Sequence, residues 1–507
     1  MTASASPAPA EPPIVLALDV GSSSVRVRAF DRRGGPVRGP RAAREYAVVT
    51  GADGAAEMDV DDLLETTFAC LDAALAEPAA AGPPIAAVAV STFVGSVVGV
   101  DAAGRAVTPL VLYGDTRAAP EVALLRARYD EREFHQRTGC RFHTSYLPAQ
   151  FLWMARARPD WIRSARQWLP LPAYLVLKLF GEARVSHSVA SWSGLLDRTT
   201  LAWDAGVLDA LPIGAAQLPP LCDADDARQG LRPPFAERWP ALRDVPWFPA
   251  IGDGAAANLG SGCTDARRMA VTIGTSTAVR VVVPDFQESL PSALWCYRVD
   301  RRRSLLGGAL NEGGNVFAWA RKVLRLPEGA GLESALSAVP TDGHGLAFLP
   351  LLAGERSPGW EPSLRGAVSG LSLITTPVDL LRAALEGVAF RIASVCASLD
   401  GALGRSPDVV ASGGGLLHSP AWLQILADVL GRAVHVSAVD EVSARGAALL
   451  VLEALGQGRL EDQPAPVAHV VEPDPERHDA HARAMRRQQA LYDHLLAELR
   501  KEGDVHV

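Results

Sequence analysis

The sequence predicts an α/β protein built from two related halves. Segments 18–25 (LDVGSSSV) and 271–278 (VTIGTSTA) resemble each other and lie about half of the 507-residue chain apart. In both halves, short apolar runs typical of buried strands alternate with segments of helical periodicity. A chain of this length usually forms two to four domains. We therefore expect two similar domains that each begin with a strand, a tight turn and a second strand.

The composition excludes several classes of protein. Hydrophobic residues make up 48% of the chain and charged residues 21%, which allows large cores and argues against extended disorder. The net charge of −8 is spread along the sequence, so we expect a small-molecule partner and no nucleic acid. The six cysteines are scattered and form no CxxC pair, which fits a reducing cytoplasm.

Neither the N-terminus nor the one long uncharged segment predicts a membrane protein. Residues 1–13 are rich in Ala, Pro and Ser and lack the features of a signal peptide, so we expect a disordered tail. Residues 79–100 are long enough to span a bilayer, but prolines and glycines divide them into pieces of strand length. Two buried strands around a turn are therefore expected there.

The first half begins with strands and continues as a mostly helical region. The patterns predict strands at 14–19 and 25–30, a helix at 61–77, strands within 85–100 and mostly helices from 118 to 180. Proline and glycine become frequent between 211 and 249, so we place a domain boundary there. This divides the chain into an N-terminal domain of residues 14–247 and a C-terminal domain of residues 248–507.

The second half repeats this order. We expect a strand that ends at Ile251, a hairpin over 271–283, a mostly helical segment over 366–389, a strand at 408–412 and a helix at 420–430. A charged amphipathic helix over 475–501 ends the chain. We expect it to pack through one apolar face, which carries Met485, Leu491, Leu495 and Leu499.

Both hairpins have the chemistry of a phosphate site. The first strand carries Asp19, and a turn of small polar residues follows, with Arg26 just beyond it: Gly21, Ser22, Ser23 and Ser24. Turn amides and hydroxyl groups bind phosphate oxygens, and a carboxylate can hold Mg²⁺ through water. The second hairpin has Thr272 in place of the aspartate and an equivalent turn: Gly274, Thr275, Ser276 and Thr277. A single turn of this kind is usually only a tight hairpin, but two at equivalent places indicate a clamp for one triphosphate.

A third glycine cluster, 413–415, lies between an expected strand and an expected helix. Glycine there allows a nucleotide to lie against the backbone, and a helix N-terminus favours anionic groups. The chain has no GxxxxGK[ST] motif, and no GxGxxG motif lies at a strand-to-helix turn. A P-loop or a dinucleotide-binding fold is therefore not supported.

Asp253 is the strongest candidate for a catalytic base. It follows an expected strand and is flanked by Gly252 and Gly254, which leave room for a ligand. A carboxylate at this place can accept the proton of a hydroxyl group that attacks a γ-phosphate. The alternative is an Asx turn or an N-cap for the alanine-rich helix that follows. Its position just before the second phosphate turn favours the base.

These motifs together resemble the FGGY family of carbohydrate kinases over nearly the whole chain. The most specific match is GAVSGL at 366–371 followed by DLLRAALE at 379–386, which fits the C-terminal signature of that family at every position. Segment 19–26 is similar to the first phosphate motif of the family, 274–276 to its second and 413–422 to its adenosine motif.

The resemblance implies two ribonuclease-H-like domains of the actin and sugar-kinase superfamily, with a sugar and ATP meeting in the interdomain cleft. The N-terminal domain would bind the sugar and the C-terminal domain ATP. Asp253 matches the catalytic base of the family, and Asp19 with Asp253 would serve Mg²⁺. By the same analogy, the ATP contacts would be Gly21, Ser22, Ser23, Ser24, Arg26, Gly274, Thr275, Gly314, Gly415 and Ser419.

Within the family, three segments look most like gluconate kinases: 271–280, 348–358 and 138–143. Asp115 and Arg117 resemble the Asp-x-Arg sugar contact of the family, in which the guanidinium can hold the carboxylate of a sugar acid. A surface salt bridge between these two side chains is the alternative.

Three places depart from the family pattern and leave the sugar open. Val94 and Gly95 stand where the family often has Met-His, although Gly95 stays within the expected substrate site. Gln150 replaces a usual Lys, and Ser186 stands where gluconate kinases tend to have Asp. Gluconate is therefore the first choice of substrate, with a pentulose such as xylulose or ribulose, or a polyol, as the alternative.

Two classes of function fit these observations. In the first, an ATP-dependent kinase phosphorylates a sugar whose hydroxyl proton goes to Asp253. In the second, an ATP-driven sugar sensor or switch uses the same fold, with phosphate turns but no base beside a sugar pocket. Asp253, Asp115 and Arg117 together favour the enzyme. The sequence leaves open whether the chain forms a homodimer.

Overall fold

The computed structural model describes residues 13–76 and 84–504. The expected tail at 1–13 lies outside this part except for Pro13, as do residues 79–83 of the expected pair of strands. The rest of that uncharged segment forms two strands, β6 (Ile85–Thr92) and β7 (Val98–Val100), as predicted. In the described residues, no helix has the length and apolar character needed to cross a membrane.

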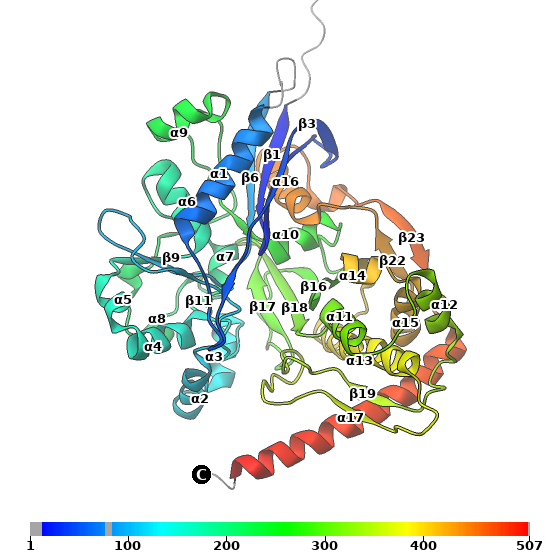
Figure 1. The fold of residues 1–507 in the computed structure, drawn as a ribbon. Coiled ribbons are helices and arrows are strands. Elements are labelled where there is room, and N and C mark those ends of the chain that lie inside the picture. Colours follow the sequence, from blue (N-terminus) through cyan, green and yellow to red (C-terminus); the bar gives the residue numbers. More distant parts are fainter. Residues whose placement is uncertain (1–12, 77–83, 505–507) are drawn as a thin grey trace, which may run out of the picture.

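The N-terminal sheet contains five strands, in the spatial order β14 (Ile251–Gly252), β6, β1 (Ile14–Val20), β2 (Ser24–Phe30) and β3 (Pro36–Glu45) (Figure 1). β1 and β2 form the first predicted hairpin, and β3 pairs antiparallel with β2. β6 pairs parallel with both β1 and β14. The carboxyl ends of β1, β6 and β14 therefore meet at one edge of the sheet.

Alternate side chains of β1 enter two different cores, which explains why this strand is continuously apolar. Leu16 and Leu18 lie in one cluster with helix α1 (Val60–Ala76). Val15 and Ala17 lie in another with helices α10 (Asp253–Gly260) and α16 (Val442–Ala454). The strand is thus covered on both faces, and its end is held in place for Asp19.

The C-terminal sheet contains seven strands, in the spatial order β17 (Trp295–Arg298), β18 (Arg303–Leu310), β16 (Thr277–Pro284), β15 (Arg268–Ile273), β21 (Asp408–Ser412), β22 (Val434–Ser437) and β23 (Val467–Val471). β15 and β16 form the second predicted hairpin, and β21 runs parallel to β15. One apolar cluster joins these strands to helices α13 (Pro377–Leu403) and α15 (Pro420–Leu430).

The two sheets repeat one arrangement, as the paired turns predicted. In each sheet an antiparallel hairpin pairs through its first strand with a parallel strand, β6 in one and β21 in the other. Asp19 lies opposite Ser91 across the first pair, and Thr272 lies opposite Ser412 across the second. The hydroxyl oxygens of Thr272 and Ser412 are 3.0 Å apart. The second copy therefore has a neutral hydroxyl pair where the first has a carboxylate.

Strand β14 lies beyond the expected boundary at residue 247 but belongs to the N-terminal sheet, which therefore extends to Gly252. Helix α10 follows it and crosses α16, which comes from the C-terminal half of the chain (Figure 1). A Cβ atom on Gly446 would lie 1.8 Å from the Ala256 carbonyl oxygen, and one on Gly260 would lie 1.7 Å from that of Val442. The two halves are thus joined by a helix crossing that only glycine permits.

The expectation of a mostly helical segment over 366–389 is wrong for its first part. Residues 367–369 form strand β20, and α13 begins only at Pro377. Thr376 and Asp379 form a capping box there, and proline at the first helical position favours the helix start. The pattern of apolar residues did not reveal this cap.

The terminal helix α17 (Pro475–Asp504) packs as expected and crosses the base of the C-terminal domain (Figure 1). Met485 contacts the main C-terminal core. Leu491, Leu495 and Leu499 pack against a smaller cluster that contains Leu349.

The remaining elements are shorter and surround the two sheets. The mostly helical region expected over 118–180 contains α2 (Ala119–Arg128), α3 (Glu131–Thr138), α4 (Leu147–Ala157), α5 (Pro159–Ser164), β9 (Gln167–Leu169) and α6 (Leu171–Phe180). The others in the N-terminal half are β4 (Val49–Thr50), β5 (Ala56–Met58), β8 (Leu110–Val111), β10 (Val185–Ser186), α7 (His187–Ser191), β11 (Leu196–Asp197), β12 (Ala202–Trp203), α8 (Ala205–Leu208), β13 (Leu221–Cys222) and α9 (Pro233–Arg238). The C-terminal half adds α11 (Gly314–Val323), α12 (Ala330–Ala338), β19 (Ala347–Leu349) and α14 (Gly414–Leu417).

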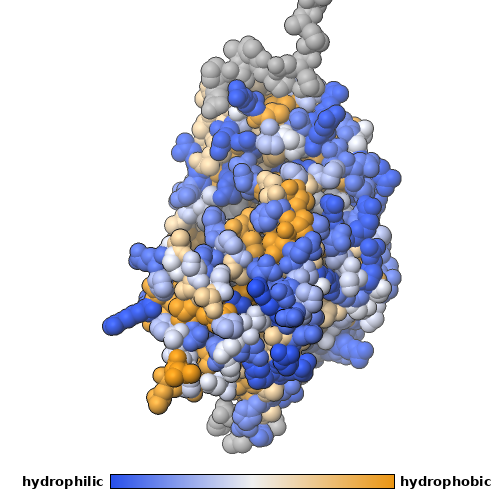
Figure 2. Space-filling view, turned by 90° about the vertical axis from the view of Figure 1, so that its right-hand side faces the viewer, coloured by the Kyte–Doolittle hydropathy of each residue, from blue (hydrophilic) through white to orange (hydrophobic). Residues whose placement is uncertain are grey.

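The face shown in Figure 2 is mostly hydrophilic, with hydrophobic residues gathered near its middle and at its lower left edge. Elsewhere along the chain, the loop between β20 and α13 carries strongly exposed apolar side chains: Leu371, Leu373 and Ile374.

Candidate active site

Two carboxylates lie at the carboxyl ends of parallel strands in the N-terminal sheet. Asp19 is next to the last residue of β1, and Asp253 directly follows β14. β6 lies between these strands, with Ser91 paired to both Asp19 and Ile251. The carboxyl ends of parallel strands are where α/β folds usually bind their ligands. The structure thus brings together the two acidic residues that the sequence singled out.

Asp19 is 6% exposed. Burial raises the pKa of its carboxyl group to about 6, although the nearby Ser91 hydroxyl opposes the shift. The negative charge of Asp253 raises this pKa further, whereas Arg26 lowers it. Among the described residues, Oδ1 of Asp19 has no hydrogen-bond partner. The fold therefore leaves part of this carboxylate available to a ligand.

Asp253 is the first residue of α10, and its carboxylate is almost unused by the fold. Oδ1 accepts a hydrogen bond from the Gly254 amide at 2.7 Å, and no other hydrogen bond to this carboxylate occurs within the described parts of the chain. The N-cap of α10 is Gly252, so Asp253 does not cap the helix. Burial raises the pKa of Asp253, and the positive charge of Arg280 opposes this.

The first predicted phosphate turn presents exposed hydroxyl groups. The Gly21 amide donates to the Ser24 carbonyl at 2.9 Å, and the Tyr46 hydroxyl donates to the Gly21 carbonyl. Ser22 and Ser23 are exposed between them, whereas Ser24 is buried. Arg26 follows on β2, also exposed. The turn is therefore closed by its backbone, and its central side chains face outward.

The three glycine segments expected to bind ATP meet in the C-terminal domain. Gly314 donates its amide to the Gly274 carbonyl at 2.8 Å, and the amide of Asn315 donates to the Thr275 carbonyl at 3.1 Å. A Cβ atom on Gly415 would lie 3.3 Å from the same Gly274 carbonyl. These contacts are long-range in sequence, so the adjacency is a property of the fold.

Ser419 has a structural task of its own. Its hydroxyl oxygen accepts a hydrogen bond from the Trp422 amide at 3.2 Å and caps helix α15. Its contact with ATP stays a prediction.

Asp115 and Arg117 form a buried ion pair. Arg117 Nη2 lies 2.6 Å from Asp115 Oδ2, and the same guanidinium also pairs with Glu57. Its Cζ atom lies 4.1 Å from the centre of the Trp153 ring. The charge of Arg117 is therefore already balanced by two carboxylates. Sugar contacts by Asp115 and Arg117 stay a prediction. The alternative salt bridge does form, but it is buried rather than on the surface.

The departures from the family pattern also have local explanations. Gln150 is buried, and its Nε2 donates to the carbonyls of Leu112 and Thr144 at 3.2 and 3.1 Å. Ser186 caps α7, accepting from the Val189 amide at 3.1 Å. Gly95 has a φ of +68°, and a Cβ atom there would lie 2.9 Å from Cβ of Tyr113. Glycine at this position therefore lets two loops approach each other.

Several residues near Asp253 escaped the sequence analysis. Trp192 stacks on Tyr297 with ring centres 3.7 Å apart, and the Tyr297 hydroxyl is 2.5 Å from that of Tyr146. Arg280 and Arg356 come from the C-terminal half, within two of the segments that resemble gluconate kinases. Those segments were visible in the sequence, but nothing in them showed that the Arg280 guanidinium lies against Gly254, next to Asp253.

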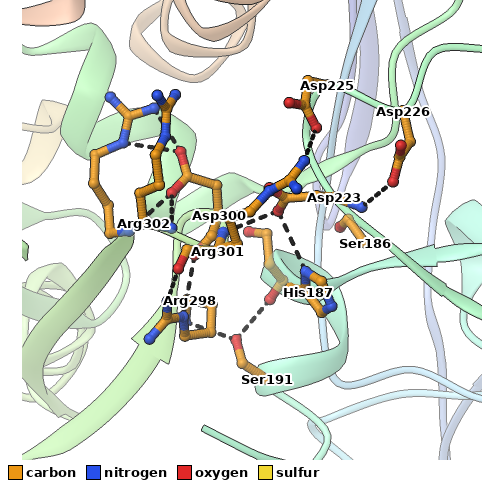
Figure 3. Close-up of polar contacts among 12 residues, drawn as sticks. Ser186, His187, Ser191, Asp223, Asp225, Asp226, Arg298, Asp300, Arg301 and Arg302 are labelled. Atoms are coloured by element: carbon orange, nitrogen blue, oxygen red, sulfur yellow. Dashed lines mark hydrogen bonds and ion pairs between the residues drawn. The ribbon is translucent and has the colours of Figure 1, made fainter. Parts of the chain in front are cut away.

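Polar contacts beside this region tie the two halves together (Figure 3). Asp223, from the N-terminal half, accepts hydrogen bonds from the backbone amide and Nε of Arg301, which lies in the turn between β17 and β18. His187 Nδ1 is 3.3 Å from the same carboxylate. The Arg298 amide of β17 donates to the Ser191 hydroxyl at 2.9 Å. The edge of the C-terminal sheet is thus anchored next to Trp192.

The acidic residues fit a magnesium ion that is shared with a nucleotide. No group of three or more His, Cys, Asp or Glu residues suited to a metal occurs in residues 13–76 and 84–504. Mg²⁺ usually binds through one or two carboxylates and takes its other ligands from water and phosphates. Asp19 and Asp253, with the unpartnered Oδ1 atom of Asp19, provide such a pair.

Comparisons with known proteins agree with this arrangement. The N-terminal domain of the FGGY family of carbohydrate kinases matches residues 14–260, and its C-terminal domain matches residues 269–455. The gluconokinase of Bacillus subtilis (strain 168) is 26% identical over 460 residues, which cover 87% of this chain and 88% of the relative. The xylulose kinase of Escherichia coli (strain K12) is 30% identical over 404 residues, which cover 78% of this chain and 82% of the relative.

Solved structures show the same fold. The xylulose kinase of Lactobacillus acidophilus has a TM-score of 0.88 and 24% identity, covering 96% of this chain and 98% of its own. The gluconate kinase of the same organism has a TM-score of 0.87 and 23% identity, covering 95% and 98%. The expected two-domain α/β fold of the actin and sugar-kinase superfamily is confirmed. The chain therefore belongs to the FGGY family of carbohydrate kinases and is a phosphotransferase with an alcohol group as acceptor.

Proposed function

We propose that this carbohydrate kinase transfers the γ-phosphate of ATP to a hydroxyl group of gluconate, with Asp253 as general base. The carboxylate of Asp253 carries the proposal, because it lies at the carboxyl end of the N-terminal sheet and the fold uses it for only one backbone hydrogen bond. The choice of gluconate is supported by the gluconokinases of Bacillus subtilis and Bacillus licheniformis, both 26% identical over 87% of this chain.

Asp253 is suited to take a proton during the reaction. The sugar oxygen forms a bond to the γ-phosphorus while the bond between that phosphorus and the ADP oxygen breaks. The hydroxyl proton passes to the carboxylate of Asp253, and the products are ADP and a phosphorylated sugar. Burial raises the pKa of Asp253, which brings its proton affinity closer to that needed near neutral pH.

The phosphate groups of ATP would lie between the two turns. We propose that the exposed Ser22, Ser23 and Thr275 and the Gly415 amide donate to phosphate oxygens. Gly274 and Gly314, whose amides already bond within the domain, would line the same site. Asp19 and Asp253 would hold Mg²⁺, which offsets the negative charge of the phosphates when it is bound.

A pentulose is the second candidate substrate. The xylulose kinase of Escherichia coli has higher identity than the gluconokinases, 30%, although over a smaller part of the chain. Gly95 also leaves the expected sugar site without the family's usual histidine.

An assay of ADP release with purified protein, ATP and Mg²⁺ tests this function. Gluconate, xylulose, ribulose, glycerol and related sugar acids are compared, and gluconate is expected to have the highest kcat/KM. Turnover without any sugar would contradict the kinase and favour the ATP-driven switch. Activity on xylulose but not on gluconate would show that the substrate is a pentulose.

Replacement of the base is the sharpest test of the mechanism. Asp253→Asn keeps the size of the side chain but removes the proton acceptor, so kcat should fall by about 1,000-fold. Asp244→Asn, at an exposed aspartate near the end of the N-terminal domain, is the control and should leave kcat unchanged. Near-normal turnover of the Asp253 variant would refute the assignment.

A further inference from the structure

We propose that Arg280 binds a carboxylate group of the substrate beside Asp253, so that this site selects sugar acids over neutral sugars of the same length. The inference rests on the proposed function, because it names the substrate class of that site. It also moves the acid-recognising role from Arg117, where the sequence placed it, to a residue of the other domain.

The pleat of strand β16 directs Arg280 toward the N-terminal half. Side chains alternate between the faces of a strand. Val279 and Val281, its neighbours in sequence, enter the core of the C-terminal domain. Val282, two residues from Arg280, belongs instead to the cluster that joins β17 to the N-terminal half. Arg280 shares that second face, although it is a charged residue in an otherwise apolar strand.

The guanidinium of Arg280 lies against the backbone next to Asp253. A Cβ atom built on Gly254 would be 3.3 Å from Nη2 and 3.4 Å from Cζ of Arg280. The same Cβ atom would be 3.1 Å from the Trp192 ring. Gly254 therefore allows an arginine and an indole to approach the catalytic carboxylate from two sides.

Arg280 has no partner within the part of the chain that the structure describes. It forms no ion pair or side-chain hydrogen bond there, and its Nε is buried. Arg280 is partly buried. Buried arginines elsewhere in the described residues have partners: Arg298 pairs with Asp285, Arg303 with Asp300 and Glu453, Arg382 with Glu386 and Arg391 with Glu355, while Arg198 and Arg445 donate to backbone carbonyls. The negative charge of Asp253 favours the charged guanidinium, but the two side chains form no ion pair. A partly buried guanidinium without a hydrogen-bonded anion costs free energy, which a bound carboxylate would recover in part.

Apart from the Asp253 carboxylate, the polar groups around this position are donors. Arg356 also forms no ion pair in the described residues, and its Nε is buried without a partner. The Trp192 indole nitrogen is likewise buried and unpartnered, and it lies 3.1 Å from where a Cβ of Gly252 would be. Guanidinium and indole N–H groups donate only, so they match a ligand group that only accepts hydrogen bonds. The carboxylate of a sugar acid and a phosphoryl group both have this property.

Two observations favour the carboxylate. In the proposed function, phosphate oxygens take their hydrogen bonds from the two glycine turns, where Ser22, Ser23 and Thr275 are exposed. Arg280 instead lies beside Trp192, whose partly exposed indole suits the carbon-bound hydrogens of a sugar. Arg117 is the weaker candidate, because Asp115 and Glu57 already balance its charge.

The test compares acid and neutral substrates of equal length, gluconate with glucitol and xylonate with xylitol. Arg280→Met should lower kcat/KM for gluconate by about 100-fold, mainly by raising KM. The kcat/KM for glucitol and the KM for ATP should stay within about two-fold of the wild-type values. Arg280→Lys keeps the charge without the bidentate geometry and should recover part of the loss. Arg302→Met, at an exposed arginine that pairs with Glu453, is the control. Arg117→Met tests the competing position.

Three outcomes would overturn the proposal. Equal losses on gluconate and glucitol, or a raised KM for ATP, would assign Arg280 to the phosphoryl group. A wild-type preference for the neutral member of both pairs would exclude acid recognition, while the kinase function would stand. A gluconate-specific loss in Arg117→Met but not in Arg280→Met would return the role to Arg117.

A binding measurement separates this inference from the kinase function. Titration calorimetry of gluconate and glucitol without ATP reports recognition alone. If no sugar is phosphorylated, the proposed function fails, but weaker gluconate binding in Arg280→Met than in the wild type would still support the carboxylate site. Equal gluconate binding by both proteins would refute it. Thermal unfolding of Arg280→Met and Arg280→Lys verifies that each variant is folded.

Discussion

Asp19 shows how a single side chain can serve a site at the expense of stability. It is nearly buried, and no described residue gives its Oδ1 a hydrogen bond. Burial raises its pKa from 3.8 to about 6. The folded state therefore binds this proton more tightly than the unfolded chain, and it loses stability as the pH rises through this range. The cost is expected for a group held ready for a cation.

We predict that Asp19→Asn is more stable but less active. In metal-free protein at pH 7, its free energy of unfolding should exceed the wild-type value by about 3 kcal/mol, because a shift from 3.8 to about 6 disappears. Below pH 3.8 both side chains are neutral, so the difference should vanish. Urea unfolding in EDTA at several pH values measures this, and the exposed Asp408→Asn is the control. A variant less stable than the wild type at pH 7 would contradict the argument.

The partners of a charged side chain also distinguish Arg117 from Arg280 as the group that recognises a sugar acid. The sequence favours Arg117, and the structure favours Arg280. Arg117 was visible as part of an Asp-x-Arg motif, and its ion pair with Asp115 spans only two residues. Its second partner, Glu57, is 60 residues away in sequence. Arg280 stands out in the sequence only as the last residue of segment 271–280, which resembles gluconate kinases. Whether an arginine is free to bind a ligand thus depends on partners that local sequence does not reveal.

At the scale of elements, the crossing of α10 and α16 holds Asp253 in place. α10 begins with Asp253, and α16 covers it from the C-terminal half. Gly260 and Gly446 allow the two backbones to approach closely enough that a methyl group on either would overlap a carbonyl oxygen. The position of the base therefore depends on two glycines that have no chemical role.

We predict that Gly446→Ala is destabilised by about 3 kcal/mol, since its Cβ atom would lie 1.8 Å from the Ala256 carbonyl oxygen and backbone has to shift. Gly401→Ala is the matched control in helix α13, where an added Cβ atom meets nothing within 4 Å. That variant should gain about 0.5–1 kcal/mol from its higher helix propensity. Urea unfolding of both proteins provides the comparison, and similar effects at the two sites would argue against a tight crossing.

At the scale of the whole molecule, the ion pairs of Figure 3 connect the two domains beside the candidate sugar site. Asp223 is 5% exposed and bonds both His187 and Arg301. Burial alone would raise the pKa of Asp223, but these two partners lower it below its usual value. The stability that this carboxylate contributes is therefore present at neutral pH and is lost as the pH falls below about 4.

We predict that Asp223→Asn lowers the free energy of unfolding by about 1–2 kcal/mol at pH 7, a modest value because Arg301 is half exposed. The difference from the wild type should shrink as the pH falls below about 4. Asp225→Asn removes an exposed partner of the same arginine and should change stability by less than about 0.5 kcal/mol. Equal effects of the two substitutions would show that burial of Asp223 does not strengthen the contact.

Much of the architecture could be predicted from local pattern. The apolar runs of β1 and β15, the polar turns that follow them and the signature around α13 are short-range features. The start of α13 was missed because a capping box is a weaker signal than apolar periodicity. The expected boundary near residue 247 was based on the composition of the loop. Strand β14 lies beyond it but belongs to the N-terminal sheet, because it pairs with β6, more than 150 residues earlier in the chain.

The sequence by itself determined the family and the repeated strand-turn-strand units, and it singled out Asp19 and Asp253 as candidate site residues. Each of these features is encoded in a few neighbouring residues. The tertiary structure alone decided which charges remain free. Glu57 balances Arg117, Gly314 meets Gly274, and Arg280 reaches Gly254 across the two sheets. These contacts depend on which strands become neighbours and on which face each side chain points to, and those are outcomes of packing the whole chain.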